Sequence, residues 1–433
     1  FAGTPHSTKT ETFMAIIVHK YGGTSMGSVE RIKNVARRVA KWHRAGYQMV
    51  VVVSAMSGET NRLIALAKEI MPNPDPRELD VIASTGEQVS IGLLAMALKS
   101  IGVDAVSFNG SQVAVHTDSA FTKARIESID SEPVKRELDA GKVVIVAGFQ
   151  GRDSAGNVTT LGRGGSDTSG VALAVALQAQ ECLIFTDVDG VYTTDPRIEP
   201  KARKLDVISF EEMLELASLG SKVLQIRSVE FAGKYHVPVR VLSSLTDPNI
   251  PVDVEASSGT LISFEDDPKM EKALVSGIAC TRDEAKITLS RVPDTPGVAY
   301  KILGPVAQHN IDVDMIVQND GLDGTTDFSF TVPRGDVDKC LKVLNEEVVP
   351  VCHPEGIHTN ADIAKVSVVG IGMRTHAGVA CRMFESLAAE GINIEMISTS
   401  EIKVSLVIQD KYMELAVRAL HKAFNLEEDK VKL

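Results

Sequence analysis

The 433-residue sequence is poor in cysteine, and what cysteine it has is scattered. The five are Cys182, Cys280, Cys340, Cys352 and Cys381. None of them forms a CxxC pair, the close spacing that zinc sites and thiol redox motifs use. The sequence therefore indicates neither a zinc site nor a disulfide framework, and we expect reduced cysteines in a cytoplasmic protein.

The sequence is also poor in positive charge: it has 45 Lys and Arg residues against 57 Asp and Glu residues, which gives a net charge of -12. Nucleic-acid binding by phosphate neutralisation needs clustered Lys and Arg, so we expect no nucleic-acid partner. This balance does not exclude a local basic pocket for a small phosphate ligand. No apolar run approaches the length of a membrane span, so we expect no membrane partner either.

The first residues lack any periodic pattern. Residues 1–13 precede Met14 and are expected to be a leader left by expression, with Met14 as the natural start. No secretory pattern follows Met14.

Residues 14–250 alternate between strand and helix patterns. Strands are predicted at 15–18, 49–54, 103–108, 142–149, 182–187 and 237–242, and several of these segments are near-continuous Val/Ile runs, typical of strands buried on both faces. Helices are predicted at 28–45, 59–70, 78–100, 166–179, 210–218 and 222–235. The alternation predicts an α/β domain with three layers, in which a mainly parallel sheet lies between helices. Ligands of such sheets bind at the carboxyl ends of the strands.

A connector at 251–269, rich in Pro, Ser and acidic residues, includes a short strand pattern at 259–263. An internal repeat follows, in which residues 285–318 resemble residues 364–398 and Met315 corresponds to Met396. Each copy reads strand, helix, strand, which predicts two ferredoxin-like βαββαβ modules, assigned to 270–345 and 346–433. A duplicated module suggests a sensor or a pairing surface. The alternative is a purely structural dimerisation tail.

The stretch VHKYGGTSMGS, residues 18–28, has the composition of an anion site. Gly22 and Gly23 let the backbone approach a ligand, because neither carries a Cβ. Lys20 adds a positive charge at the end of a predicted strand. Ser28 is a good N-cap for the next helix, whose free N–H groups favour negative charge. The alternative is a tight turn with an exposed lysine.

Five further polar loops follow predicted strands or open predicted helices: SAMSGETN (54–61), STGEQVS (84–90), TTLGRGGSDTSG (159–170), FTDVDGVYTTDPR (185–197) and GSKVLQIRSVE (220–230). Each could singly be a cap or a turn, and Glu87 could be a first-turn acid satisfied by the helix dipole. Together they supply glycine-rich backbone, isolated cations and carboxylates. That combination is the equipment of phosphoryl transfer.

The ordered set of motifs closely resembles the aspartate kinases, a family within the amino acid kinase superfamily. KYGGTS, SAMSGETN, STGE, GRGGSDTS, FTDVDGVYTTDPR and SKVL occur in this order, and the resemblance covers the chain from Met14 onward. The single motifs are weak signals, whereas the ordered set is specific. The usual first motif has Phe where this chain has Tyr21, which is a mild change. The C-terminal repeat looks like the paired ACT regulatory domains of that family.

The resemblance implies ATP-dependent phosphorylation of the L-aspartate side chain to 4-phospho-L-aspartate, the first step toward lysine, threonine and methionine. Mg²⁺ would bridge the phosphates, and no metal ligand from the protein is predicted. Carried over by motif, the catalytic residues are Lys20 and Asp167. The ATP-binding residues are Lys20, Gly22, Gly23, Thr186, Asp187, Tyr192, Arg197 and Lys222. The aspartate-binding residues are Ser54, Thr60, Glu87, Arg163 and Ser166.

The residue types suit this reaction. A side-chain carboxylate has an ordinary pKa of about 4, so it is ionised at neutral pH and needs no general base; the loops quoted above contain no histidine. Arg163 can hold the α-carboxylate of the substrate bidentately, and Glu87 can pair with its α-ammonium.

Two rival interpretations remain. The first is a kinase for glutamate, acetylglutamate or a nucleotide, although Glu87 argues against an N-acetylated substrate. The second is a non-enzymatic sensor, against which the intact Lys20, Arg163 and Asp167 argue.

The repeat also predicts regulation and assembly. By resemblance, lysine, threonine or both would bind between paired ACT modules at Asp294, Gln318 and Asn393, and the chain would form a homodimer or a higher oligomer. The two copies have diverged there, since Asp294 corresponds to Thr375 and Asp312 to Asn393. Met270 could also start a separate, shorter regulatory subunit.

Overall fold

The computed structural model describes residues 15–219, 223–264, 274–321, 323–371, 373 and 378–428. The expected leader, Met14, the predicted nucleotide residue Lys222, Met270 and Thr375 lie outside these ranges. The chain divides into two compact units, which are described separately. The first comprises Phe1–Val191, Lys204–Leu214 and Lys222–Asp266, and the second comprises Tyr192–Arg203, Glu215–Ser221 and Asp267–Leu433.

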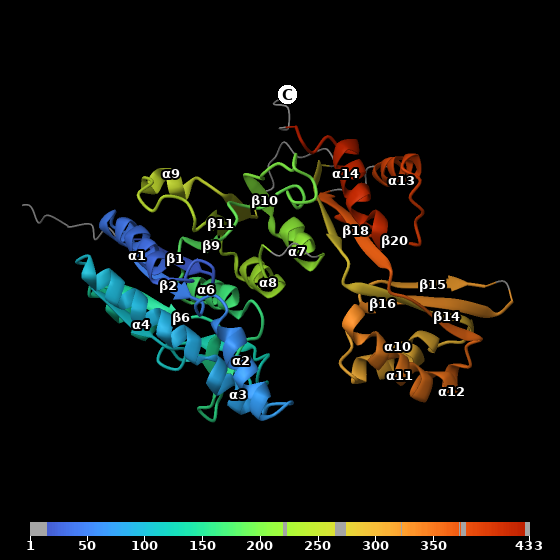
Figure 1. Cartoon of the computed structure of the whole chain (residues 1–433), viewed down its shortest axis with the longest axis horizontal. Helices are drawn as coiled ribbons and strands as arrows, with labels where there is room; N and C mark the ends of the chain where they lie inside the picture. The colour runs from blue at the N-terminus through green and yellow to red at the C-terminus, as the bar shows by residue number, and fades with distance from the viewer. Residues whose placement is uncertain are drawn as a thin grey trace, which may run out of the picture. The chain divides into compact units, whose positions relative to one another are not determined.

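The first unit is built on an eight-stranded sheet with the order β10-β12-β11-β9-β1-β2-β6-β3. Figure 1 labels β10, β11, β9, β1, β2 and β6 of this sheet. Its strands are β1 Ile16–Tyr21, β2 Gln48–Val53, β3 Ala105–Phe108, β6 Val143–Ala147, β9 Glu181–Thr186, β10 Val207–Ser209, β11 Val239–Ser243 and β12 Thr260–Ser263. Neighbouring strands are parallel except β11 and β12, which are antiparallel. The mainly parallel sheet and the short strand at 259–263 are therefore confirmed.

The helices that accompany this sheet are α1 Val29–Arg44, α2 Glu59–Ile70, α3 Pro76–Ala83, α4 Thr85–Ser100, α5 Glu132–Asp139, α6 Gly165–Ala176, α7 Phe210–Ser218, α8 Ile226–Tyr235 and α9 Val252–Ala256. One helix was predicted at 78–100, but the structure has two, which meet at Ser84. The hydroxyls of Ser84 and Thr85 donate to the carbonyls of Val81 and Ile82. Such bonds to the preceding turn compete with the helical ladder and end or bend helices.

The stretch Pro76–Ser100 is long and apolar enough, by length and composition alone, to cross a membrane. One such stretch is weak evidence, because core helices pass the same test. Here Ile91, Leu94 and Leu98 are buried in the core that α4 shares with the sheet.

The two faces of β1 meet different helices, because side chains alternate along a strand. Ile17 and Tyr21 belong to the core with α1 and α4, and the ring of His19 lies edge-on to Trp42 of α1, with 5.1 Å between centroids. Lys20 belongs to the other face, where α6 packs. A Cβ added at Gly170 of α6 would lie 3.1 Å from Cβ of Lys20. The helix layers on both faces confirm the predicted three-layer domain.

A second, small sheet was not predicted from the sequence. It has the order β5-β4-β7-β8 and contains β4 Val115–Thr117, β5 Ile126–Ile129, β7 Gln150–Arg152 and β8 Val158–Thr160. Buried Asp80 of α3 ties it to the domain, because its carboxylate accepts hydrogen bonds from the N–H and hydroxyl of Thr160 and from the N–H of Thr122.

A buried network of charges fastens α9, in the predicted connector, to α1. Arg38 is fully buried, and its Nε donates to Oε1 of Glu255 at 2.7 Å. The other oxygen of Glu255 accepts from Lys41 at 2.8 Å and from the indole N–H of Trp42 at 2.7 Å. The guanidinium of Arg38 also donates to the carbonyl of Thr246 at 2.8 Å. The carboxylate of Glu255 thus offsets a cation that has no access to water.

We predict that Glu255→Ala lowers the free energy of unfolding by about 3–5 kcal/mol, because it leaves the buried Arg38 uncompensated. Urea unfolding followed by the fluorescence of Trp42, the single tryptophan, measures the loss. The control is Asp253→Ala, which removes an exposed carboxylate from the same helix and should change stability by less than about 0.5 kcal/mol. Equal stability of the two variants would contradict this account of the network.

The second unit contains two four-stranded sheets, with the orders β13-β18-β20-β19 and β15-β16-β14-β17. The strands are β13 Leu274–Thr281, β14 Glu284–Pro293, β15 Ile316–Asp320, β16 Thr325–Pro333, β17 Gly356–Asn360, β18 Ile363–Ile371, β19 Met396–Thr399 and β20 Lys403–Gln409. The helices are α10 Val298–Gln308, α11 Val337–Val343, α12 Val349–Cys352, α13 Val379–Ala389 and α14 Met413–Ala423, with short turns η1 Arg334–Asp336, η2 Leu344–Val348 and η3 Asp410–Tyr412. We call the sheet around β14 the first module and the sheet around β18 the second.

The two modules exchange strands. β13 pairs with β18 in the second module, although it precedes the first module in sequence. β17, which follows α12 in the sequence, pairs with β14 of the first module. The sheets therefore do not follow the contiguous ranges 270–345 and 346–433 strand by strand.

Reciprocal ion pairs join the modules. Lys286 of the first pairs with Glu395 of the second at 2.7 Å, and Lys365 of the second pairs with Asp314 of the first. In the repeat, Lys286 corresponds to Lys365 and Asp314 to Glu395. Equivalent residues thus make equivalent contacts in both directions, which is what a self-complementary interface between two similar modules requires.

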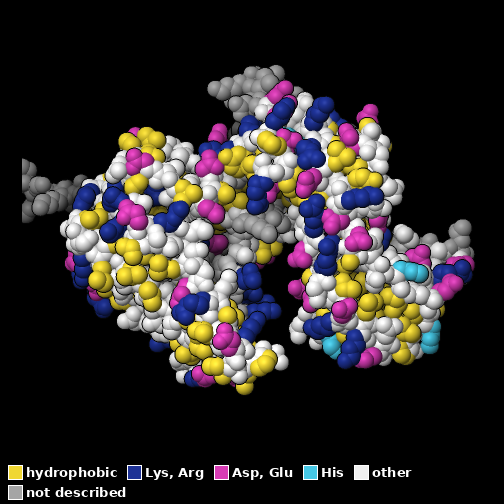
Figure 2. Space-filling view, in the orientation of Figure 1, with side chains coloured by type: hydrophobic (Ala, Val, Ile, Leu, Met, Phe, Trp, Pro, Cys, Tyr) yellow, Lys and Arg dark blue, Asp and Glu magenta, His cyan; other side chains and the backbone are white. Residues whose placement is uncertain are grey.

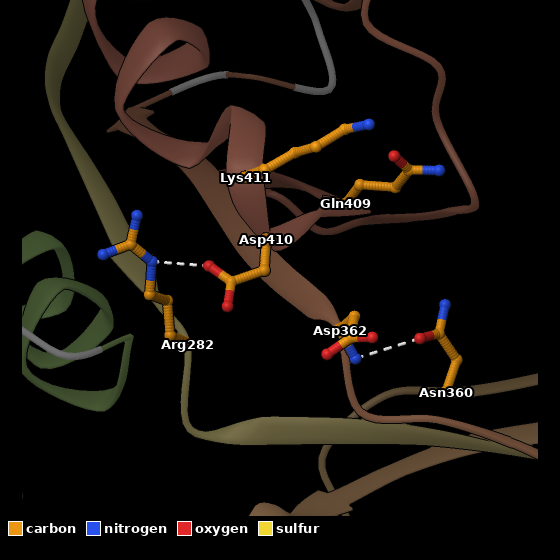
Figure 3. Close-up of a pocket in the computed structure, with 6 residues that line it drawn as sticks. All are labelled: Arg282, Asn360, Asp362, Gln409, Asp410 and Lys411. Carbon is orange, nitrogen blue, oxygen red and sulfur yellow. Dashed lines mark hydrogen bonds and ion pairs between the residues drawn. The ribbon is translucent and has the colours of Figure 1, made fainter.

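A hollow of about 740 Å³ lies within this unit. Its lining residues, drawn in Figure 3, are Arg282, Asn360, Asp362, Gln409, Asp410 and Lys411. Arg282 points toward Asp410 and is ion-paired with it at 2.6 Å (Figure 3). None of the residues that the sequence singled out lines this hollow. Figure 2 shows acidic and basic side chains interspersed over the visible face of each unit.

Candidate active site

The carboxyl ends of three central strands bring the predicted loops together. β1 pairs in parallel with β2 on one side and with β9 on the other, and Tyr21 lies level with Val53 and Phe185. The glycine turn follows β1, a loop that begins at Ser54 follows β2, and a segment that begins at Asp187 follows β9. These segments therefore share one edge of the sheet, the place where ligands of parallel sheets bind.

A buried ion pair lies at this edge. Lys20, near the end of β1, is 6% exposed, and its ammonium contacts Oδ1 of Asp167 in the first turn of α6. A Cβ added at Gly22 would lie 3.6 Å from Nζ of Lys20, so the ammonium lies beside the glycine turn. The carboxylate of Asp167 offsets much of the charge of this lysine, whereas the free N–H groups at a helix N-terminus favour an anionic ligand.

The glycine turn is packed tightly on both sides. The N–H of Gly22 donates to the carbonyl of Phe185 at 3.3 Å, which ties the turn to β9. A Cβ added at Gly23 would approach the carbonyl oxygen of Ala55 to 3.3 Å. A side chain at Gly23 would therefore require the neighbouring loop to shift.

Glu87 is buried in an unusual state. It is 3% exposed, and its Oε1 accepts a hydrogen bond from the N–H of Ala55 at 3.1 Å, whereas its buried Oε2 has no hydrogen-bond partner. Burial raises the pKa of Glu87 to about 7. An unsatisfied buried carboxylate oxygen costs free energy, and an ammonium ligand would supply the missing partner. The interpretation of Glu87 as a simple first-turn acid does not account for this burial.

Two other predicted substrate residues meet each other near this edge. The hydroxyl of Ser54, after β2, donates to that of Ser166 in α6 at 2.8 Å. Thr60 lies half-buried in the first turn of α2, the helix that follows the Ser54 loop.

Arg163 is carried by a loop with special backbone geometry. Gly162 and Gly164, on either side of it, have φ values of +79° and +71°, a region that favours glycine. Arg163 is exposed, and the structure gives its guanidinium no ion-pair partner in the part of the chain that it describes. A Cβ added at Gly164 would lie 1.6 Å from Cγ of Gln225, so the residue before α8 packs closely on this loop.

The predicted nucleotide residues are only partly assembled. Thr186 is the last residue of β9 and Asp187 follows it, and the hydroxyl of Thr186 donates to Oδ1 of Asp187 at 3.1 Å. Tyr192 and Arg197 belong to the segment 192–203 of the second unit, where Arg197 pairs with Asp195 at 2.6 Å. The roles of these two residues stay predictions, as does that of Lys222.

One contact at this edge was missed in the sequence. The hydroxyl of Ser25, within the glycine turn, donates to that of Ser244 at 2.7 Å. Ser244 directly follows β11, so a hydroxyl after a strand end was the available signal. It was overlooked because no glycine or charged residue accompanies it.

No group of three or more His, Cys, Asp or Glu residues that could hold a metal ion occurs among the residues with described positions. The five cysteines are free.

The predicted effector residues lie on the surface of the second unit. Asp294 is exposed after β14, and its N–H donates to the carbonyl of Gly324 at 3.0 Å. Gln318 is exposed on β15, and Asn393 is exposed between α13 and β19. Asp294 and Gln318 belong to the first module and Asn393 to the second, and their effector role stays a prediction.

Comparison with known proteins identifies the family. The amino acid kinase family matches residues 15–243, and the ACT domain matches residues 290–348 and 366–424. An aspartokinase of Pseudomonas aeruginosa is 63% identical over 415 residues, which cover 96% of this chain and 98% of that protein. The chain belongs to the aspartokinase family. It is therefore a phosphotransferase that uses ATP, phosphorylates a carboxyl group of aspartate and is regulated allosterically through ACT domains.

Solved structures of this family agree with the fold. The crystal structure of E. coli aspartokinase III in complex with aspartate and ADP, described as the R-state, has a TM-score of 0.78 and 27% identity, and the match covers 94% of this chain and 99% of that one. The same enzyme in complex with lysine and aspartate, described as the T-state, has a TM-score of 0.73 and 28% identity, with 95% and 100% covered. The predicted combination of an amino acid kinase domain with ACT domains is thereby confirmed.

Proposed function

We propose that the chain transfers the γ-phosphoryl group of ATP to the side-chain carboxylate of L-aspartate and releases 4-phospho-L-aspartate and ADP, the first step toward lysine, threonine and methionine. One observation carries the proposal: the Lys20–Asp167 pair lies at the same strand edge as the loop that contacts Glu87, whose buried carboxylate has one oxygen without a partner. The complex of E. coli aspartokinase III with aspartate and ADP supports it.

In this mechanism Lys20 stabilises charge on the transferred phosphoryl group, and Asp167 holds the lysine in place. The backbone of Gly22 and Gly23 approaches the phosphates, and Thr186 and Asp187 lie beside the nucleotide. Tyr192, Arg197 and Lys222 would complete the nucleotide site. Mg²⁺ would neutralise part of the negative charge of the phosphates. We assign it no ligand from the protein.

The substrate is held by its α-amino and α-carboxylate groups. Glu87 pairs with the ammonium, and Arg163, which has no acidic partner of its own in the described structure, pairs with the carboxylate. Ser54, Ser166 and Thr60 lie around the side-chain carboxylate. Positioning and charge stabilisation do most of the work in phosphoryl transfer, so no general base is assigned.

A coupled assay of ADP release with a panel of acidic amino acids tests this function. We expect turnover with L-aspartate, little with glutamate and none with N-acetylglutamate, which has no ammonium for Glu87. Preference for glutamate or N-acetylglutamate would overturn the assignment of substrate. ATP binding without turnover of any member would favour a sensor.

We predict that the kcat/KM for aspartate rises with pH up to about 7 and then levels off. Below this pH the carboxyl of Glu87 in the free enzyme is protonated, because burial raises its pKa to about 7, and a neutral carboxyl cannot pair with the substrate ammonium. The kcat/KM profile reports ionisations of the free enzyme. Glu87→Gln should raise the KM for aspartate, leave the KM for ATP nearly unchanged and abolish this ionisation. An unaltered profile in the variant would assign the ionisation to another group.

We further propose a cytoplasmic homodimer or higher oligomer, with a catalytic domain at 14–250, a connector at 251–269 and ACT domains at 270–345 and 346–433, apart from the exchanged strands. Lysine, threonine or both would inhibit it by binding at Asp294, Gln318 and Asn393. The lysine complex of the T-state E. coli enzyme supports lysine as an effector. A shorter subunit that starts at Met270 is part of this proposal.

We predict that Asp294→Ala weakens inhibition by lysine or threonine while the uninhibited kcat stays nearly intact. Allosteric coupling is typically about 1–3 kcal/mol, so loss of one effector contact should raise the inhibitory concentration at least severalfold. Initial rates against each amino acid, singly and combined, measure the effect. Asp338→Ala, an exposed carboxylate on α11, is the control. Equal inhibition of both variants would reject Asp294 as a contact.

A further inference from the structure

Ser244 contacts three segments that are far from it in the sequence. Its N–H and its hydroxyl both donate to the carbonyl of Thr186, at 2.8 Å and 3.0 Å. Its hydroxyl oxygen accepts from the hydroxyl of Ser25 at 2.7 Å, and its carbonyl accepts from Arg38 at 3.2 Å. The residue thus ties the glycine turn, the end of β9 and helix α1 to the end of β11.

The hydroxyl protons leave one consistent arrangement for this contact. Each serine hydroxyl has one proton to donate. Ser244 gives its proton to the carbonyl of Thr186, and Ser25 gives its own to Ser244, because the alternative acceptor for Ser25, the carbonyl of Phe185, is 3.5 Å away. Ser25 is 1% exposed, so water does not readily replace Ser244 as its acceptor.

The carbonyl side of Ser244 is held just as firmly. The guanidinium of Arg38 donates to it and is itself fixed by Glu255 at 2.7 Å. Arg38 also lies over the ring of Phe185, with 5.1 Å from Cζ to the ring centroid. Arg38 therefore also contacts Phe185, the residue before Thr186. Ser244 stands one residue beyond the segment 15–243 that matches the amino acid kinase family.

We propose that Ser244 is a positioning residue for the nucleotide. It fixes the distance between the glycine turn, which approaches the phosphates, and the strand end at Thr186, which lies beside the nucleotide. This inference rests on the proposed function, because the nucleotide is placed at these two segments there. A site that is already held in its bound geometry loses less conformational freedom when the ligand binds. The hydrogen bonds of Ser244 therefore favour affinity for ATP.

The test compares Ser244→Ala with Ser243→Ala. The first leaves the buried hydroxyl of Ser25 with only the carbonyl of Phe185, 3.5 Å away, as an acceptor. Loss of the shorter buried hydrogen bond should raise the KM for ATP and the dissociation constant of ADP about tenfold. The KM for aspartate should change by less than about twofold, because Glu87 and Arg163 lie on other loops. Ser243 directly precedes Ser244, and its hydroxyl accepts a local bond from the N–H of Leu245 at 3.1 Å, so its variant should bind ADP as the wild type does.

Two further variants separate positioning from folding. Ser244→Thr keeps a hydroxyl and should restore most of the affinity for ADP. Ser25→Ala should weaken ADP binding as Ser244→Ala does, and the double variant should be little worse than either single one, because both remove the same bond. Fluorescence of Trp42 during urea unfolding checks that each variant is folded.

The following results would overturn the inference, the proposed function or both. Unchanged ADP affinity in a folded Ser244→Ala variant of an active enzyme overturns the inference and leaves the proposed function standing. An equal loss for ATP and aspartate also overturns it, because that result indicates a general structural role. Wild-type protein that binds ADP but releases no ADP from ATP in the presence of aspartate overturns the proposed function. The ADP titrations of the variants still test the positioning role of Ser244. Wild-type protein that binds no ADP overturns both.

Discussion

The buried ion pair between Lys20 and Asp167 is the interaction around which the first unit is arranged. It joins the end of β1 to the first turn of α6, and the other loops of the site gather at the same edge of the sheet. Removing two charges from water is costly, and a buried ion pair often stabilises a fold less than apolar residues would. The small residues of α6, among them Gly170, bring the helix close enough to make the pair. We attribute the pair to function, because it holds a cation where the transferred phosphate is proposed to lie.

Charged side chains away from the site are also paired with opposite charges. Arg38 is buried because Glu255 accompanies it, and through Ser244 it supports the edge where the nucleotide is proposed to bind. In the second unit, the reciprocal pairs of Lys286 and Lys365 hold two similar modules together in both directions. A duplicated module can thus diverge on its surface, as at Asp294 and its counterpart Thr375, while the contacts between its copies stay equivalent.

The sequence predicted those parts of the fold whose signals are local. The Val/Ile runs of β1, β2 and β9 mark buried parallel strands, and the glycines and charges after them mark the site. The strands of the small sheet have three or four residues each, too few for a periodic pattern. Strand exchange between the modules and the contact of Ser25 with Ser244, 219 residues apart, depend on tertiary packing. Tyr192 and Arg197 fall in a different compact unit from Lys20, Glu87 and Asp167, which no motif reveals.

The role of Lys20 is tested by the turnover number of a Lys20→Met variant with saturating ATP and aspartate. We predict a fall in kcat of about a hundredfold or more, the usual cost of losing one group that stabilises a transition state. Lys33→Met, which removes an exposed lysine from α1, is the control and should turn over normally. Near-normal kcat in a folded Lys20→Met variant would contradict the account.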